Sequence, residues 1–545
     1  MSRQTLMLIE VSGIQEYIFA SNELKQNIGA SELVRQASTD WAFDALPKPN
    51  NLLCRPTNYL DLCEWEVTDQ SLEAEGLQAE VIYAGGGNAL LLFAEEPQAL
   101  AFARQLTLRA LQEAPGLRVV LKHRTFDPQS TVVRALLHDL RGELLRRKLD
   151  HQVSVPLLGL GVTAGCVFTG APAVAEDAEG RLISAEAQAK QQARDRAENR
   201  LRHLLRGAVA VEFEFVHDFG KLGERGKSSY LALIHTDGNG MGKRIEGLAR
   251  HCTTPGHNVE YRRALRRFSQ GVERAANEAL VNTVELLVGA VNHKDWTIAG
   301  KVPVPLCDGN RRCLPFRPIV FGGDDVTFVS EGSLGLALAV KYLQEYSLHT
   351  LDDGGLAHAR AGVAVVPSHY PFSRAYDVAE ELCASAKRFI GANDEPNGLT
   401  ALDWHFAVSG PLLPLEDIRK REYTVRIERQ KHSLLMRPLR LHPVSGDWHS
   451  WETFRQLMAK FQSRAREDGE WGRRRNKVKA LREALRAGPE AVEAFVRTAL
   501  DGRTLPPIAN LQEMPTRGWQ GRQCGYFDAI EALDLYVSLE GGQTP

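Results

Sequence analysis

Two adjacent acidic residues lie at the tip of a predicted β-hairpin. The segment VFGGDDVTFV places Gly322, Gly323, Asp324 and Asp325 between two apolar, strand-like pieces. An acidic turn of this kind is often only a solvated loop. The alternative is a metal site, which requires a further carboxylate and a phosphate-binding turn elsewhere in the chain.

A third acid, Asp237, ends the predicted strand LALIHTD and precedes the glycine-rich run GNGMGK. Pairing of this strand with the hairpin brings its carboxylate beside Asp324 and Asp325, where divalent cations would relieve the repulsion. We therefore expect Asp237, Asp324 and Asp325 to be catalytic and, with Thr236, to hold two Mg²⁺ or Mn²⁺ ions. Two such ions about 3.5 to 4 Å apart activate a ribose hydroxyl and neutralise a departing pyrophosphate.

The glycine-rich turn after Asp237 is the candidate nucleotide-binding element. Its backbone N–H groups are free to approach phosphate at the start of a predicted helix, whose dipole favours anions. Two lysines are candidate cations for a triphosphate, and the alternative for each is an ordinary exposed lysine. The nucleotide-binding candidates are Gly238, Gly240, Gly242, Gly322, Gly323, Lys243 and Lys387.

The elements that must position these residues follow a βαββαβ order from about residue 230 to 392. The segments in order are the strand YLALIHT, a long helix near YRRALRRFSQGVERAANEALVNTVELLVGAV, the GGDD hairpin, the helix LGLALAVKYLQEYSL, the strand ARAGVAVVP and the helix SRAYDVAEELCASAKRFIG. This order is that of a ferredoxin-like or palm domain.

The N-terminal 125 residues repeat this order without the acids. LIEVSG aligns with LIHTDG, and YAGGGNALLLF aligns with VFGGDDVTFV. Ser12 stands where the second copy has Asp237, and Gly87 and Asn88 stand roughly at the place of the two hairpin acids. Because Glu10 alone cannot hold two ions, we expect the first copy to be structural or to hold nucleotide.

The predicted fold class is α+β, with two ferredoxin-like palm domains of the nucleotide cyclase and polymerase type. Residues 1–125 form a degenerate first palm domain, 126–229 a helix-rich connector, 230–410 the second palm domain with the GGDD site, and 411–545 a mainly helical C-terminal domain. The last region contains a basic run, WGRRRNKVKALREALRAG. This run is either a solvated helix face or a contact for RNA or a partner.

Composition narrows the class of protein. The chain has 545 residues and a formal net charge of −2, which gives no whole-chain argument for nucleic acid. No apolar run reaches the ~18 residues that span a bilayer and no signal peptide is evident, so we expect a cytoplasmic protein without membrane contact.

The eight cysteines include no C-x-x-C pair, and we expect reduced, mostly buried thiols. A zinc loop of Cys252, His257, Cys307 and Cys313 is the alternative.

Two His-Asp pairs invite comparison with metal-dependent phosphohydrolases. They are His217–Asp218 in VHDFGKLG and His138–Asp139 in LLHDLRGEL. That chemistry requires further histidine and aspartate ligands on packed helices. The first pair lies in strand-like sequence and the second is isolated, so we do not expect a hydrolase.

Five motifs in register carry a family resemblance. IEVSGIQEYIFAS, YAGGGNALLLF, HTDGNGMGK, FGGDDVTFV and PSHYPFSRAYDVAEELCASAK, in this order, resemble the large palm-domain subunit of type III CRISPR effector complexes over most of the chain. The resemblance implies a GGDD enzyme that polymerises and cyclises ATP into cyclic oligoadenylate, a second messenger in antiviral defence. By position, it implies that Asp237 and Asp325 are metal ligands, with Asp324 beside them and Lys387 near the phosphates.

The chain also departs from the family pattern. It starts directly at the first palm, so we expect a compact form without the His-Asp nuclease domain found in many members. The usual four-cysteine zinc element of the connector is not evident. Asn239 stands where many members have a second acid, which could alter the affinity for metal.

Two functions from different classes remain open. In the first, the chain is a nucleotidyltransferase that makes cyclic oligonucleotides from ATP, alone or when RNA engages its complex. In the second, it is mainly a non-catalytic, nucleotide-binding scaffold of an RNA-guided assembly. The expected partners are ATP, guide or target RNA and other CRISPR effector subunits, and a homo-oligomer is compatible with the sequence.

Overall fold

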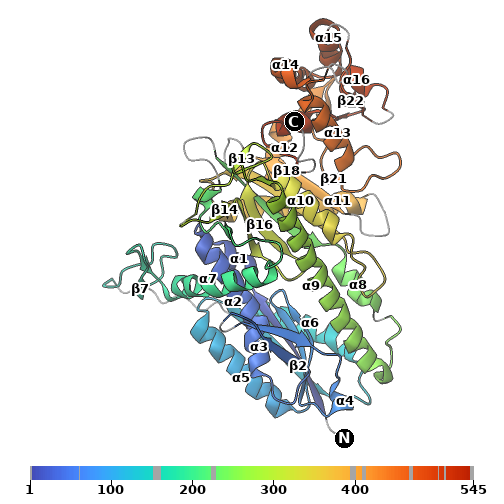
Figure 1. Cartoon of the computed structure of the whole chain (residues 1–545). Helices are drawn as coiled ribbons and strands as arrows, with labels where there is room; N and C mark the ends of the chain where they lie inside the picture. Colours follow the sequence, from blue (N-terminus) through green and yellow to red (C-terminus); the bar gives the residue numbers. More distant parts are fainter. Residues whose placement is uncertain are drawn as a thin grey trace.

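The molecule is an elongated mixture of helices and strands, with its N-terminal and C-terminal parts at opposite ends (Figure 1). The computed structural model describes residues 3–59, 62–150, 161–222, 229–248, 250–307, 309–392, 400–407, 413–465, 471–500, 503–508 and 511–539. The mixed α+β class agrees with the prediction. None of the helices within these ranges combines the length and hydropathy of a membrane span.

A four-stranded antiparallel sheet forms in the N-terminal part (Figure 1). In spatial order its strands are β4 (Ala79–Gly85), β5 (Asn88–Phe93), β1 (Gln4–Ser12) and β6 (Arg118–Phe126). Successive side chains of β1 point to opposite faces, so Met7 and Ile9 pack in one apolar cluster and Leu6 and Leu8 in another. Helices cover both faces. The first cluster includes α2 (Leu24–Ser38) and α5 (Glu96–Glu113), and the second includes α6 (Val133–Asp150).

The second sheet repeats this strand order and extends it. In spatial order its strands are β15 (Phe316–Val320), β16 (Val326–Glu331), β10 (Tyr230–Gly238), β17 (Ala359–Pro367), β18 (Ala401–Phe406) and β21 (Leu439–Arg440). Its first four strands are arranged as in the first sheet. In each sheet the strand that comes first in the sequence, β1 or β10, lies third in space, between the hairpin and the last strand of the copy. The predicted βαββαβ succession is therefore present in both parts.

Helices cover the second sheet on both faces. Ile234 of β10 shares an apolar cluster with α9 and α10, and Leu233 shares another with α11. The cluster around Leu233 also contains Met7 and Ile9, so one continuous core joins the two sheets. The covering helices are α9 (Asn258–Gly289), α10 (Gly335–Tyr346) and α11 (Phe372–Ala392).

The predicted connector helix, α7 (Ala185–Leu204), crosses α2 at close range. A Cβ atom on Gly29 would lie 1.6 Å from the carbonyl oxygen of Lys190, so only glycine fits at this crossing. A second contact links α1 (Ile14–Phe19) to α11. The ring of Phe19 stacks on that of Tyr376, with 4.0 Å between the ring centroids. The first contact joins the connector helix to the first part of the chain, and the second joins the first part to the second.

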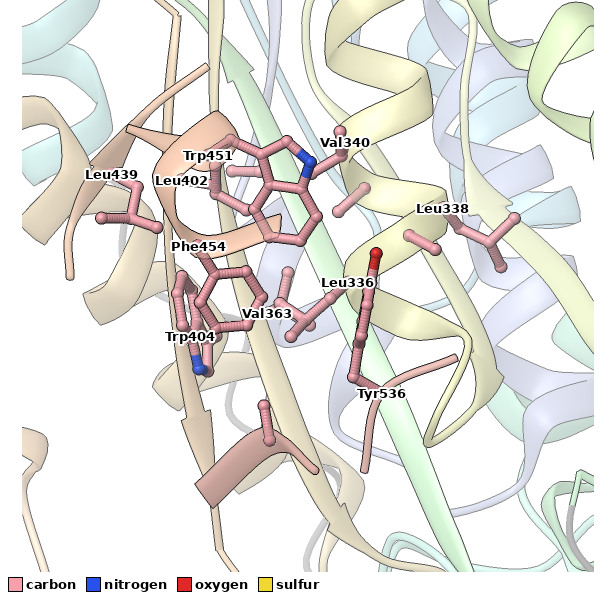
Figure 2. Packing of buried hydrophobic residues seen from close by; sticks show 14 of the residues in the cluster. Leu336, Leu338, Val340, Val363, Leu402, Trp404, Leu439, Trp451, Phe454 and Tyr536 are labelled. Atoms are coloured by element: carbon pink, nitrogen blue, oxygen red, sulfur yellow. The ribbon is translucent and has the colours of Figure 1, made fainter. Parts of the chain in front are cut away.

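The C-terminal part contains a small sheet in addition to its helices. The four strands are β19 (Thr424–Ile427), β20 (Gln430–Ser433), β23 (Gln523–Cys524) and β22 (Trp519–Gln520). Its helix α13 (Trp451–Gln462) docks on the second sheet through Phe454, whose ring centroid lies 5.1 Å from that of Trp404 on β18. Figure 2 shows Trp451, Tyr536 and Leu336 of α10 around the same contact.

The predicted basic run is only partly a solvated face. Its main helix is α14 (Arg475–Ala487). Lys477 donates to the carbonyl oxygen of Ala499, and the guanidinium groups of Arg482 and Arg486 lie 5.3 and 4.9 Å from the ring centroid of Phe527. These three side chains therefore hold the C-terminal part together.

The prediction of reduced thiols is wrong for four of the eight cysteines. Disulfides join Cys54 to Cys63 and Cys307 to Cys313, because two short hairpin-like segments bring the Cα atoms to 5.8 and 5.2 Å. The second disulfide also removes the zinc loop that would have combined Cys307 and Cys313 with Cys252. The other four cysteines are free and buried: Cys166, Cys252, Cys383 and Cys524.

Candidate active site

Three acids meet at the end of the second sheet. Thr236 of β10 pairs with Val326 of β16, so Asp237, the next residue on β10, comes beside the β15–β16 turn that carries Asp324 and Asp325. One carboxylate oxygen from each acid lies within 4.8 Å of the other two. The antiparallel register thus brings together residues that are 87 or more positions apart in the sequence.

Burial and repulsion oppose the ionisation of the two hairpin acids. The pKa of Asp324 is raised first by burial and then by the charge of Asp325. The pKa of Asp325 is raised by desolvation of its carboxylate within the turn and then by the charge of Glu380 on α11, although the residue as a whole is exposed. A divalent cation would relieve both effects, and a donor set made only of carboxylate oxygens suits Mg²⁺ or Mn²⁺.

Arg360 of β17 is a site residue that the sequence analysis missed. It lies opposite Asp237 in the β10–β17 ladder and is 4% exposed. Its guanidinium forms an ion pair with the Asp237 carboxylate and donates to Oδ1 of Asn239 at 3.1 Å. The pair fixes the direction of the Asp237 carboxylate. The available signal was one charged residue inside the apolar strand ARAGVAVVP.

The side chain of Thr236 points away from the acids. Its hydroxyl donates to the carbonyl oxygen of Val326 at 3.1 Å, and the residue is fully buried. Neighbouring residues of a strand face opposite sides of the sheet, so the side chains of Thr236 and Asp237 diverge. The expectation that Thr236 is a metal ligand finds no support in its side chain.

Gly238 allows the acidic turn to approach β10. A Cβ atom at this position would lie 2.8 Å from Cβ of Asp324 and 2.7 Å from Cε of Met241. Gly240 has a φ of +72°, which favours glycine at the turn into α8 (Met241–Leu248). Gly242 lies in the first turn of α8, where a Cβ atom would meet nothing within 4 Å.

The turn of the first sheet faces the acidic turn of the second. A Cβ atom on Gly85 would lie 3.9 Å from the carbonyl oxygen of Gly322, and one on Gly323 would lie 3.9 Å from Cα of Gly86. Gly322 has a φ of +99°. The two glycine-rich turns therefore meet, and the three acids lie where the two sheets approach one another.

Arg200 of α7 borders the acidic turn. Its guanidinium lies 3.8 Å from the ring centroid of Phe321, the residue before the GGDD motif, and its Nε donates to Glu32 of α2 at 2.9 Å. Glu32 is buried and also binds Arg35 at 2.8 Å. The polar sequence of α7 indicates only a connector helix and does not predict these contacts.

The first copy carries a different polar arrangement. Glu10 pairs with Asn88 in the β1–β5 ladder, and its carboxylate binds Nζ of Lys148 on α6 at 2.6 Å. Ser12 lies opposite Arg118 in the β1–β6 ladder. Glu10, the acid that the first copy has near this position, is thus paired with a lysine.

The two candidate lysines do not join the acids. Lys243 on α8 and Lys387 on α11 are both exposed, and neither forms an ion pair with Asp237, Asp324 or Asp325 among the residues that the structure describes. Glu380 is the residue of α11 whose charge acts on Asp325. Lys387 lies two helical turns beyond it, or about 10 Å along the helix.

The His-Asp pairs lie apart from this cluster. The side chain of His138 on α6 is 91% exposed, and Asp218 accepts from the backbone N–H of Gly220 at 2.9 Å to cap a short helix. Neither arrangement gathers the ligands that a phosphohydrolase needs.

Solved structures share the fold of almost the whole chain, although no protein-family model and no curated protein matches it. Csm1 of T. onnurineus gives a TM-score of 0.51 at 15% identity over 98% of this chain and 70% of that chain. A Csm1–Csm4 cassette in complex with cA4 gives 0.51 at 13% identity over 98% and 69%. The Csm1–Csm4 subcomplex of the type III-A CRISPR-Csm interference complex gives 0.51 at 13% over 98% and 70%.

The chain has the Csm1 fold. The likeness extends along almost the entire chain, and it agrees with the resemblance that the five sequence motifs carry. Because the sequences are only 13 to 15% identical, this likeness shows the fold alone. The chemistry of the site in this chain rests on the residues described above.

Proposed function

We propose that this chain is a nucleotidyltransferase that polymerises ATP into cyclic oligoadenylate as part of a type III CRISPR defence system. The observation that carries the proposal is the meeting of Asp237, Asp324 and Asp325 within 4.8 Å at the junction of two ferredoxin-like sheets. Both sheets then act as palm domains, the first degenerate and the second catalytic. The cA4 bound to a Csm1–Csm4 cassette supports this choice of substrate class.

Each residue of the site has a role in this proposal. Asp237, Asp324 and Asp325 would hold two Mg²⁺ or Mn²⁺ ions, and Arg360 orients the Asp237 carboxylate through their ion pair. When bound, such ions activate the attacking hydroxyl and neutralise the departing pyrophosphate. The backbone N–H groups around Gly238 and Gly240 bind phosphate at the start of α8.

The first palm supplies the second wall of the site. Its Gly85–Gly86 turn lies against Gly322 and Gly323, so a nucleotide bound there would lie next to the acids. Lys243 and Lys387 remain candidates for the phosphate tail, because long exposed lysines can turn toward a bound anion. The domain division at residues 125, 229 and 410 is part of the same proposal.

The proposed partners are ATP, guide or target RNA and other effector subunits. The structural neighbours are Csm1 chains, two of them with Csm4. The exposed part of the basic run, including Arg475 and Lys479, is the candidate contact for RNA or a partner subunit. A non-catalytic scaffold is the alternative function.

Product analysis tests the proposed function. The purified chain, alone and assembled with target RNA and its partner subunits, is incubated with Mg²⁺ or Mn²⁺ and each nucleoside triphosphate separately. We expect pyrophosphate and adenylate oligomers, identified by mass spectrometry, from ATP. Binding of ATP without any product in either form would support the scaffold instead.

Gly238→Ala is expected to lower ATP condensation at least tenfold. The added Cβ would push against Asp324 and Met241, which separates the acidic turn from β10. The free energy of unfolding should fall by about 1–3 kcal/mol, as for overpacked cores. Pyrophosphate release and urea unfolding measure the two effects.

The matched control for this substitution is Gly247→Ala, also in α8, where a Cβ atom meets nothing within 4 Å. It should keep full activity and gain up to about 1 kcal/mol of stability from helix propensity. Equal activity of the two variants would show that the close approach at Gly238 is not needed.

A further inference from the structure

A second cluster of metal-binding side chains lies away from the acidic site. His251, Cys252 and Glu260 each offer one ligand atom within 4.8 Å of the other two. His251 Nε2 and Glu260 Oε1 are 3.0 Å apart. His251 and Cys252 lie between α8 and α9, and Glu260 lies in the first turn of α9. None of the three belongs to the proposed catalytic centre.

The cluster combines one buried sulfur with two exposed polar side chains. Cys252 is 2% exposed and packs in the apolar cluster that contains Tyr261 of α9 and Leu137 of α6. The side chains of His251 and Glu260 are 63% and 58% exposed and lie on the solvent side. An ion bound here would be held from below by sulfur and from above by nitrogen and oxygen.

We infer that His251, Cys252 and Glu260 bind a zinc ion. One sulfur, one nitrogen and one oxygen are a donor set that Zn²⁺ accepts and that Mg²⁺ does not favour. Zinc–ligand bonds of about 2.0–2.3 Å at tetrahedral angles place neighbouring ligand atoms about 3.3–3.6 Å apart. The observed separations need only small side-chain movements to reach these values.

The fourth position is open to water or to His257. The ring centroid of His257 lies 6.4 Å from that of His251. Thr254 Oγ1 lies 3.0 Å from Nδ1 of His257, a contact that orients the ring and leaves Nε2 as the other nitrogen. A turn of this ring toward the cluster would complete four protein ligands.

The ion would be structural and would hold the end of α8. This helix begins at Met241, directly after the glycine turn that follows Asp237. Its Arg244 is anchored to Asp353 at 2.6 Å, so its first part is held independently of the zinc ligands. The zinc ion would fix the other end of α8 to the start of α9 and, through Cys252, to α6.

Metal analysis of the full chain tests the inference. The wild type, Cys252→Ser and His251→Ala are loaded with Zn²⁺, dialysed and assayed for zinc, and each is then titrated with Co²⁺. We expect about one zinc per wild-type chain and a near-ultraviolet thiolate-to-Co²⁺ charge-transfer band. Both signals should disappear in Cys252→Ser, and zinc affinity should fall more than about 100-fold in His251→Ala, since residues that merely orient a ligand already contribute about 10–100-fold.

Controls separate this site from the acidic one and from misfolding. Asp324→Asn with Asp325→Asn should keep the zinc and the Co²⁺ band, and Cys166→Ser should do the same. Because His251 is exposed, its variant stays folded and decides the question if Cys252→Ser does not. Absence of the band in the wild type, or unchanged zinc affinity in His251→Ala, would overturn the inference.

Discussion

Replacing Asp324 and Asp325 together by Asn is expected to lower ATP condensation by on the order of 1,000-fold or more. The two residues supply carboxylate ligands, and metal stabilisation of transition-state charge contributes several kcal/mol, with about 1.4 kcal/mol for each factor of ten. The measurement is pyrophosphate release at saturating ATP over a range of Mg²⁺ concentrations. Retained synthesis in the double variant would remove both residues from the mechanism.

The same variant should be more stable than the wild type at neutral pH. In the folded chain the pKa of each of the two acids is raised above the ordinary value of about 3.9. The folded state therefore keeps protons that the unfolded state has lost, so wild-type stability falls as pH rises from about 4 through the raised folded values. Asn carries no such penalty.

Urea unfolding at several pH values, without divalent metal, measures this difference. The stability advantage of the double variant should be small near pH 4 and should grow toward pH 8. A double variant that is less stable than the wild type at pH 8 would mean that the acids are structural.

Glu80→Gln is expected to lower the free energy of unfolding by about 3–5 kcal/mol. Glu80 of β4 is fully buried and binds Arg262 at 3.2 Å and Arg266 at 2.6 Å. Both arginines lie on α9 and are buried. Gln would leave Arg266 without its shortest ion pair, whereas Arg262 would keep its contact with Glu73 at 2.5 Å. The measurement is the urea unfolding transition with circular dichroism and tryptophan fluorescence.

Arg267→Ala on the same helix is the matched control. Its side chain is 52% exposed and binds the exposed Asp69 at 2.9 Å, a surface pair that contributes about 0–1 kcal/mol. Equal destabilisation by the two substitutions would show that the buried network does not join α9 to the first sheet.

The acidic cluster was predictable because it depends on local patterns. Alternating apolar residues predict the two strands of the hairpin, and strand pairing brings Asp237 beside the turn. The same alternation places Thr236 on the opposite face from Asp237, which a stricter use of the two-residue period would have indicated. Gly238 has a close contact with the acidic turn and Gly322 has a positive φ, although the glycine-rich motifs indicated these positions only as phosphate-binding.

Contacts between distant elements were not predictable in this way. Arg200 reaches the acidic turn because α7 crosses α2, and Arg360 reaches Asp237 because β17 is the other neighbour of β10. Neither fact follows from the residues around the arginine itself. The Cys307–Cys313 disulfide likewise depends on a local fold that cysteine spacing alone does not specify. The basic run was predicted as a single surface, either solvated or in contact with a partner, whereas Arg486 packs on Phe527.

Binding of Mn²⁺ tests most directly the claim that the three acids form a divalent metal centre. Mn²⁺ is titrated into the chain in the presence of a non-hydrolysable ATP analogue, and electron paramagnetic resonance measures the concentration of free Mn²⁺. The same titration of the analogue alone is the reference. Mn²⁺ prefers oxygen ligands, so the sulfur-containing cluster around Cys252 does not compete. We predict two bound Mn²⁺ ions per wild-type chain and a loss of both in Asp324→Asn with Asp325→Asn. Equal Mn²⁺ binding by the two proteins would contradict the account.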